Sequence, residues 1–356
     1  IYYKYITSVM KLTGATSNMK KNVTFSDIAK YANVSKATVS RYFNNPECLT
    51  QTTKQKIATV LEQLNYQENK VARILANGKT EFIGIIMPNL FHQYYTQLLN
   101  HILETYSKYG YKFIVFSGKE DLQQERQYIS ELLAYQIEGL IVLSHTIPSY
   151  ELKQLPIPVV SIEREDTYIS SVNTNNYHGG VQATKKLIQN QCDILIHINN
   201  SIDKKRPAYG RIEGFIDICE QYHKPYQVIF EELDNCYLDY LHKMEQVLKI
   251  LQKQYPEQKK GVFCSNDTIA NALLNVLVRQ QIQIPNQYEV IGFDNSVLSQ
   301  QSIIPMTTIA QNIEQIAAYT MEILTKQIEQ KKHALPQQPI RQMVVEPEII
   351  VRETTL

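Results

Sequence analysis

Glycine, proline, cysteine and long apolar runs are all scarce in this chain of 356 residues. Its 12 glycines and 13 prolines, with 44% apolar and 20% charged residues, exclude a fibrous or disordered protein. Five widely spaced cysteines without a C-x-x-C pair argue against a disulfide framework or a zinc ribbon. Apolar runs such as 82–87 and 139–143 are far shorter than the roughly 20 residues that span a bilayer, and no apolar stretch near the N-terminus suits secretion. We therefore expect a cytoplasmic globular protein of two or three packed units, with reduced, inert thiols and no membrane partner.

Several signatures of enzymes are absent as well. The chain contains no G-x-G-x-x-G, Walker A, G-x-S-x-G or H-E-x-x-H motif, and its eight histidines do not pair at metal-ligand spacing. This absence lowers the expectation of nucleotide-dependent, serine-hydrolase and zinc chemistry. We expect no catalytic residue, no metal and no cofactor.

The net charge of +1 hides an uneven distribution along the chain. Residues 20–79 carry ten Lys/Arg against four Asp/Glu, whereas residues 80–356 carry 24 against 31. A small basic part on a large acidic part predicts that the first meets a polyanion and that the second has another task.

Helical periodicity begins at Thr24. Thr24 and Asp27 have the spacing of a capping box, and Asn33 can adopt the left-handed conformation that ends a helix. Ser35 then suits the N-cap of a second, short helix rich in Ser, Thr and basic residues, and a third helix is predicted over 52–64. Two helices joined by a tight turn predict a helix-turn-helix whose second helix enters the major groove of DNA. The alternative is that the two helices pack for structural reasons alone.

From residue 82 onward, apolar strand segments alternate with amphipathic helices. This rhythm predicts parallel sheets covered by helices, and its length suits two doubly wound lobes. Ligands of such folds bind at the carboxyl ends of the strands, so we expect a site in the cleft between the lobes. The expected strands are 82–87, 112–116, 139–144, 158–162, 194–198, 227–230, 261–264 and 289–293.

Residues 34–44 read V-S-x-x-T-V-S-R-x-x-N, and with them the chain resembles the lactose and galactose repressor family of bacterial regulators. The resemblance continues through further segments in order, at 64–66, 69, 72–73, 75, 265–267, 291–294, 305–311 and 352–356. It implies an all-α helix-turn-helix head and a two-lobed α/β body like the periplasmic binding proteins. The implied divisions are a leader without regular structure over 1–21, the head over 22–66, a hinge over 67–79 and the body over 80–356. Within the body, the first lobe would comprise about 80–175 and 309–340, and the second about 176–308 and 341–356.

The resemblance also implies which residues of the head meet DNA. Lys36 and Arg41 can donate to guanine, and Ala37 can offer a methyl contact to a base. Contacts with phosphates are expected from Ser35, Thr38, Ser40 and Asn44. Tyr31 is a further phosphate donor, unless it is half-buried.

The resemblance implies that 71–77 form a hinge helix, which two subunits insert into the minor groove. Asn69 and Ala72 would contact the DNA there, and Leu75 would wedge a base step open. Alternatively, Leu75 packs on its own domain. The chain departs from the family at Glu68, where a proline is usual.

In the body, the resemblance implies an effector site in the cleft. Arg211, Asn266, Asp294 and Gln311 would fix the hydroxyl groups of a sugar, with Glu163 as an acidic contact. Tyr94 and Tyr95 would close over the sugar ring. The alternatives are that Asp267 caps its helix and that Arg211 is merely solvated. Residues 204–206 form either a solvated loop or a contact for a phosphorylated effector.

We therefore expect a ligand-responsive transcriptional regulator, a repressor of a carbohydrate-utilisation operon. Its partners would be a pseudo-palindromic double-stranded operator, a carbohydrate effector and a second copy of the chain, because no apolar heptad tail for a tetramer follows. The effector could act as inducer or corepressor. A sugar-processing enzyme and a solute-binding protein on the same two-lobed fold are the alternatives.

Overall fold

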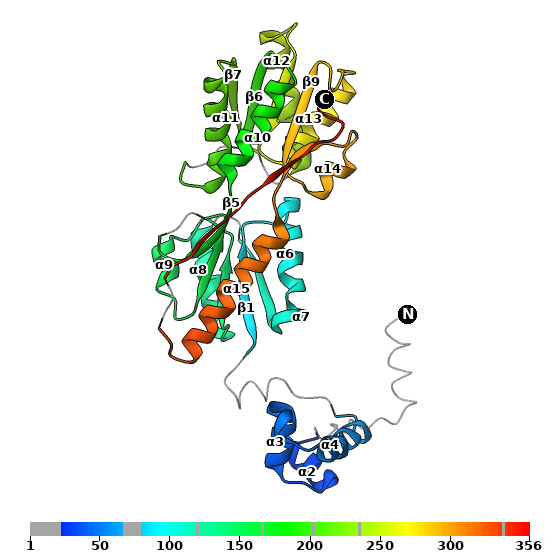
Figure 1. The fold of residues 1–356 in the computed structure, drawn as a ribbon, viewed down its shortest axis with the longest axis vertical. Helices are drawn as coiled ribbons and strands as arrows, with labels where there is room; N and C mark the ends of the chain where they lie inside the picture. The colour runs from blue at the N-terminus through cyan, green and yellow to red at the C-terminus, as the bar shows by residue number, and fades with distance from the viewer. Residues whose placement is uncertain are drawn as a thin grey trace, which may run out of the picture. The chain divides into compact units, whose positions relative to one another are not determined.

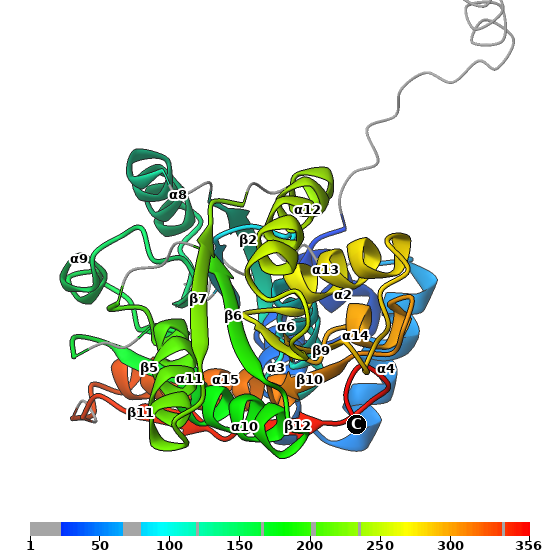
Figure 2. The same cartoon turned by 90° about the horizontal axis from the view of Figure 1, so that it is seen from above.

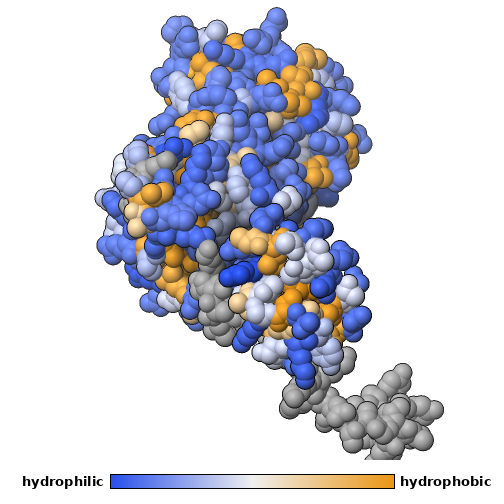
Figure 3. Space-filling model, turned by 60° about the horizontal axis from the view of Figure 1, so that its bottom comes forward, coloured by the Kyte–Doolittle hydropathy of each residue, from blue (hydrophilic) through white to orange (hydrophobic). Residues whose placement is uncertain are grey.

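The computed structural model divides the chain into two compact units, residues 1–78 and 79–356, which contain the expected head and the expected body (Figure 1). It describes residues 23–66, 80–118, 121–164, 167–200, 204–233, 236–336 and 339–356. The leader and the hinge helix expected from the sequence lie outside these residues. No helix in the described ranges is both long and apolar enough to cross a membrane. On the face drawn in Figure 3, hydrophobic residues form small separate patches among hydrophilic ones.

The head is built from three α-helices whose ends agree with the sequence signals. The helices are α2 (Phe25–Ala32), α3 (Lys36–Asn44) and α4 (Gln51–Gln63), with a 3-10 turn at Pro46–Cys48. Thr24 and Asp27 form the expected capping box, and Asn33 ends α2 with a φ of 51°. Ser35 caps α3 by accepting from the backbone N–H of Thr38. The predicted helix-turn-helix is confirmed.

The core of the head lies where the three helices meet. Ile28, Val39 and Ile57, one from each helix, have no exposed surface. The rings of Phe25 and Phe43 stack beside them with 5.1 Å between centroids. This packing fixes α3 against α2 and α4, so the opposite face of α3 is left to the solvent.

The first lobe of the body contains a six-stranded sheet in the order β11-β5-β4-β3-β1-β2, with every neighbouring pair parallel. The buried apolar clusters place α6 and α15 on one face of this sheet and α8 and α9 on the other. The elements are β1 (Phe82–Met87), α6 (Gln93–Glu104), α7 (Tyr106–Tyr109), β2 (Lys112–Ser117), α8 (Leu122–Ala134), β3 (Gly139–Val142), α9 (Ser149–Lys153), β4 (Val159–Ile162), β5 (Ser170–Thr174), α15 (Ile313–Lys332) and β11 (Gln342–Val345).

The second lobe repeats this design with the order β12-β10-β9-β8-β6-β7, in which only β12 is antiparallel. Helices α12 and α13 cover one face, and α10 and α11 cover the other (Figure 2). The elements are α10 (Asn176–Gln189), β6 (Ile194–Asn200), a 3-10 turn (Pro207–Tyr209), α11 (Gly210–Gln221), β7 (Tyr226–Glu231), α12 (Tyr237–Gln254), β8 (Lys260–Cys264), α13 (Asp267–Arg279), β9 (Tyr288–Asp294), α14 (Val297–Gln301), β10 (Thr307–Ala310) and β12 (Glu348–Ile350). All eight strands expected from the sequence are present.

The chain passes between the lobes three times, and this differs in one respect from the expected division. The crossings follow β5, β10 and β11. The expected second lobe included 341–356, but Gln342–Val345 pairs with β5 in the sheet of the first lobe. Likewise β10, which ends at Ala310, belongs to the second lobe beyond the boundary expected at 309. The expected boundaries were wrong there because β11 and β10 were not recognised as strands.

Candidate functional site

Helix α3 of the head carries a polar face opposite its buried residue. Val39 is fully buried in the core, whereas Lys36, Ala37 and Arg41 are exposed. Ala37 and Arg41 are four residues apart and thus lie on one side of the helix. Ala37 and Arg41 are therefore accessible on one face of α3, and Lys36 is exposed next to them at the start of the helix.

Two hydrogen bonds order the remaining polar side chains of this helix. The Ser35 hydroxyl lies 2.8 Å from the Thr38 hydroxyl, and the Asn44 amide donates to the Ser40 hydroxyl at 3.2 Å. Tyr31 on α2 is 68% exposed, so it is not half-buried. These groups are on the surface, as donors to phosphates must be. Asn69, Ala72, Leu75 and Glu68 lie outside the described residues.

In the body, polar residues of both lobes gather at the carboxyl ends of strands. We define the inter-lobe polar cluster as Tyr94, Tyr95, Glu163, Asn176, Arg211, Asp294 and Gln311. Glu163 follows β4, Asp294 ends β9 and Gln311 follows β10. Glu163 and Asp294 both have a positive φ, 56° and 107°. Such backbone conformations are disfavoured for residues with a side chain and concentrate at functional sites.

One chain of hydrogen bonds in the cluster joins the two lobes. Glu163 of the first lobe accepts from the Asn176 amide at 2.9 Å, and Asn176 accepts from Arg211 Nε at 2.7 Å. Arg211 also donates to the Ser265 carbonyl at 2.5 Å, and its guanidinium carbon lies 3.6 Å from the centroid of the Phe293 ring. Arg211 is only 8% exposed, so it is not the solvated side chain of the alternative interpretation.

A second set of contacts surrounds Asp294. Its carboxylate accepts from the Gln311 amide at 2.6 Å, and Gln311 in turn accepts from the Thr174 hydroxyl at 2.5 Å. Burial raises the pKa of Asp294 to about 8, with the nearby charge of Arg211 acting in the opposite direction. A carboxyl group with such a pKa can both donate and accept hydrogen bonds near neutral pH.

Tyr94 and Tyr95, on the first turn of α6, lie close to these charges. Burial, followed by the negative charges of Glu163 and Asp294, raises the pKa of Tyr94. Burial and the same carboxylates raise the pKa of Tyr95 to about 12. The Tyr94 hydroxyl is buried without a hydrogen-bond partner among the described residues. Because an unpaired buried hydroxyl is unfavourable, it is a candidate contact for a ligand.

Asn266 and Asp267 have roles that differ from the alternative interpretation. Asn266 is the N-cap of α13, where its side-chain oxygen accepts from the backbone N–H of Ile269 at 2.9 Å. Asp267 is not the cap: it is buried and accepts from the backbone N–H and the hydroxyl of Ser296 and from the Thr308 hydroxyl. Contact of Asn266 with a ligand stays a prediction.

Arg206, the last residue of the basic segment 204–206, also acts near the cluster. Its positive charge opposes the rise in the pKa of Tyr95. Burial, with the charges of Arg206 and Arg164 as further causes, lowers the pKa of His145 to about 3. Arg206 is half-buried, and its effect on Tyr95 shows that its charge acts on the cluster.

A cavity of about 550 Å³ opens at the crossings between the lobes. Asp294 and Gln311 line it together with Gln97 and His101 of α6. A second cavity, of about 590 Å³, lies in the first lobe between α9 and the end of α15, away from the cluster. The cavity of about 550 Å³ is the candidate ligand cavity, because Asp294 and Gln311, which line it, belong to the inter-lobe polar cluster. No group of three or more His, Cys, Asp or Glu that could hold a metal occurs in the described parts of the chain.

Sequence reasoning missed Asn176, Phe293 and the Ser265 carbonyl. Asn176 follows β5, a strand of polar composition (Ser-Ser-Val-Asn-Thr) that hydropathy does not reveal. The rule that ligands meet the carboxyl ends of strands would have singled out Asn176 had β5 been recognised. Phe293 immediately precedes Asp294, but its position under a guanidinium is a product of the tertiary fold.

Comparison with known proteins identifies related sequences and structures. The family described as "Bacterial regulatory proteins, lacI family" matches residues 24–69, and a "Periplasmic binding protein-like domain" matches residues 184–355. A sucrose operon repressor of Pediococcus pentosaceus is 31% identical over 319 residues, covering 87% of this chain and 95% of the relative. A ribose operon repressor of Halalkalibacterium halodurans is 28% identical over 333 residues, covering 93% and 97%. The structure of a Lac repressor dimer bound to operator and the anti-inducer ONPF shares the fold, with a TM-score of 0.79 at 20% identity over 94% of this chain and 100% of that one.

Proposed function

Because this chain belongs to the lacI family of bacterial regulatory proteins, whose members are DNA-binding transcription regulators and not enzymes, we propose that it represses a carbohydrate-utilisation operon. The effector is a sugar or sugar phosphate, which binds the inter-lobe polar cluster and changes the affinity of the head for its operator. The names of the ribose and sucrose operon repressors support a carbohydrate.

One observation carries the proposal for the effector. Buried polar groups of both lobes converge in the cluster, and the buried Tyr94 hydroxyl among them has no hydrogen-bond partner in the described residues. A sugar hydroxyl can both donate and accept, so it can pair with Tyr94, Arg211 and the Asp294 carboxyl at once. Aromatic side chains combined with a few polar groups are typical of such sites.

A ligand in the cluster acts by linkage. Glu163 belongs to the first lobe, and Arg211 and Asp294 belong to the second, so a ligand that touches all three favours one arrangement of the lobes. It shifts the equilibrium of DNA binding only by the difference between its affinities for the two arrangements. Comparing operator affinity with and without the effector decides whether the ligand is an inducer or a corepressor.

If Arg206 contacts the effector, we expect the effector to carry a phosphate group. Arg206 is half-buried, and its charge acts on Tyr95 and His145. A guanidinium can bind phosphate oxygens through two parallel hydrogen bonds. The relative affinities for a sugar and for its phosphate therefore report whether Arg206 contacts the ligand.

The head reads the operator through the exposed face of α3. Lys36 and Arg41 donate to base edges and Ala37 contacts a methyl group, while Ser35, Thr38, Ser40, Asn44 and Tyr31 hold phosphates. Asn69, Ala72 and Leu75 complete the contacts in the minor groove.

Two heads on a homodimer read a pseudo-palindromic operator. Among the described strands, β2 pairs only with β1 and β7 only with β6, so each sheet ends in an unpaired edge. Beside the second edge, Phe230 is 49% exposed and Leu238 is 73% exposed. Unpaired edges beside exposed apolar side chains support a surface that a second copy covers.

A thermal-shift screen of the full chain against D-ribose, sucrose and their phosphates tests the proposed effector. A ligand at 100 times its Kd adds about 2.7 kcal/mol of stability. The shift should vanish in Arg211→Ala and persist in Lys224→Ala, which removes a contact with the Cys192 carbonyl away from the cluster. Equal shifts in both variants would mean that the sugars stabilise the chain non-specifically, and the proposed site would be wrong.

A further inference from the structure

The loop that follows Asp294 begins with two residues of unusual backbone conformation. Asp294 and Asn295 are consecutive residues with positive φ, 107° and 52°. Asparagine tolerates the left-handed conformation, but the φ of Asp294 is disfavoured and persists only where surrounding contacts hold it. The orientation of the Asp294 carboxylate therefore depends on whatever holds this loop.

Arg352 holds the loop from one side. Its Nη2 donates to the Asn295 side-chain oxygen at 2.7 Å. Its Nη1 donates to the Met306 carbonyl at 2.8 Å and to the Ser299 hydroxyl at 3.2 Å. One planar guanidinium thus connects the beginning, the middle and the end of the segment 295–306, which a point charge such as lysine cannot do.

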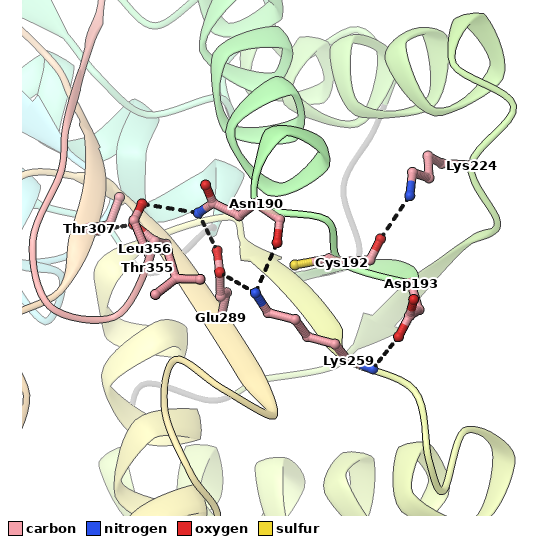
Figure 4. Close-up of polar contacts among 9 residues, drawn as sticks. All are labelled: Asn190, Cys192, Asp193, Lys224, Lys259, Glu289, Thr307, Thr355 and Leu356. Carbon is pink, nitrogen blue, oxygen red and sulfur yellow. Dashed lines mark hydrogen bonds and ion pairs between the residues drawn. The ribbon is translucent and has the colours of Figure 1, made fainter.

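The segment that carries Arg352 is itself fixed to the second lobe. The Thr354 hydroxyl donates to the Val290 carbonyl at 2.6 Å and accepts from the backbone N–H of Thr307 at 2.9 Å. In Figure 4 the Thr355 hydroxyl lies beside that of Thr307, at 2.8 Å, and Asn190 donates to the Leu356 carbonyl at 3.2 Å. The guanidinium is therefore presented from an anchored backbone.

Asp267 holds the same loop from the other side. Its buried carboxylate accepts from the backbone N–H of Ser296 at 2.7 Å and from the Ser296 hydroxyl at 2.8 Å. Thr308, which donates to Asp267 at 2.6 Å, also accepts from the backbone N–H of Asn295 at 3.3 Å. The two residues directly after Asp294 are thus clamped between Asp267 and Arg352.

We propose that Arg352 is a positioning residue for the effector site: through Asn295 it holds the loop that directs the Asp294 carboxylate into the inter-lobe polar cluster. This assignment rests on the proposed function, in which Asp294 contacts the effector. The side chain of Arg352 contacts Asn295, Ser299 and Met306, none of which belongs to the cluster, so among the described residues it acts on Asp294 through the loop. A variant that loosens the loop lets water reach Asp294.

The titration of Asp294 tests the proposal without any ligand. Full-length chain labelled with ¹³C at aspartate carboxyls is titrated by NMR, and the Asp294 signal is assigned by its loss in Asp294→Asn. Because hydration favours the charged form, the midpoint in Arg352→Gln should fall by at least about one pH unit. Arg352→Lys keeps the charge but not the fork, so its midpoint should fall between the two. Asn190→Ala, which releases the same segment at Leu356 away from the loop, should leave the midpoint unchanged.

Ligand affinity provides the second test, with D-ribose and sucrose as probes measured by calorimetry. Arg352→Gln should lower the affinity for the sugar by about tenfold. In the Asp294→Asn background, Arg352→Gln should cause no further loss of affinity. An unshifted Asp294 midpoint, an equal shift in Asn190→Ala, or a loss that persists without Asp294 would overturn the assignment. If Asp294→Asn binds the sugar as the unmodified chain does, the proposed effector site fails, and the titration alone decides the role of Arg352.

Discussion

Replacing Asp294 by asparagine should change how the stability of the body depends on pH. Burial raises the pKa of Asp294 to about 8 from an ordinary value of 3.8. The folded chain therefore keeps a proton that the unfolded chain releases, and the stabilisation is lost as the pH rises through this window. Asparagine cannot titrate, so Asp294→Asn should lack this loss.

The expected magnitude follows from the linkage relation. Between pH 5 and pH 8, one such carboxyl lowers the free energy of unfolding by up to about 1.4 kcal/mol per pH unit. The difference between Asp294→Asn and the unmodified chain should thus grow by up to about 4 kcal/mol over this range, and level off above pH 8. Burial raises the pKa of Asp267 to about 6, and the charge of Asp267 is one of the causes that raise the pKa of Asp294, so the difference includes the interaction between the two carboxyls.

Urea unfolding at several pH values measures this difference. The chain has no tryptophan and 24 tyrosines, so tyrosine fluorescence reports unfolding. Asp217→Asn, which removes an exposed carboxylate on α11, is the matched control and should run parallel to the unmodified chain. Parallel curves for Asp294→Asn as well, within about 1 kcal/mol over the whole range, would refute the argument that burial keeps Asp294 protonated.

Two further predictions separate DNA binding from effector binding. Lys36→Ala should cost about 1 to 3 kcal/mol and relax the preference at one operator position, whereas Thr38→Ala should weaken all sequences alike; selection on randomised DNA compares the two, and an unchanged consensus for Lys36→Ala would contradict its assignment to a base edge. Arg211→Ala should lower the affinity for the effector by at least about tenfold, because it removes a charged side chain that contacts the ligand, and should leave the affinity for the operator unchanged. Calorimetry and fluorescence anisotropy measure the two halves, and undiminished effector affinity would show that the ligand site is elsewhere.

Local features of the head could be read from the sequence because they depend on neighbours along the chain. The capping box of Thr24 and Asp27, the left-handed Asn33 and the N-cap Ser35 each involve residues within four positions of one another. The same holds for the eight expected strands of the body, because six of them carry buried hydrophobic runs and the two edge strands, β2 and β7, are mostly half-buried. Alternation of strand and helix was then sufficient to predict two doubly wound lobes.

Strands of polar or mixed composition were not recognised, and the lobe boundaries were wrong as a consequence. Ser170–Thr174 has one apolar residue among five and becomes a buried strand only because β4 and β11 pair with it on either side. Gln342–Val345 carries no signal that assigns it to the first lobe, because its partner lies about 170 residues earlier in the chain.

The sequence alone determined the residue types of the candidate site, and the tertiary structure decided their relations. Glu163, Arg211, Asp294 and Gln311 were named from the family resemblance, but their hydrogen bonds run through Asn176 and Thr174, which no local pattern singles out. The high pKa of Asp294 and the hold of Arg352 on the loop after it arise from burial and from contacts between distant segments. Such long-range effects depend on which elements the fold brings together, and local sequence patterns do not predict these contacts.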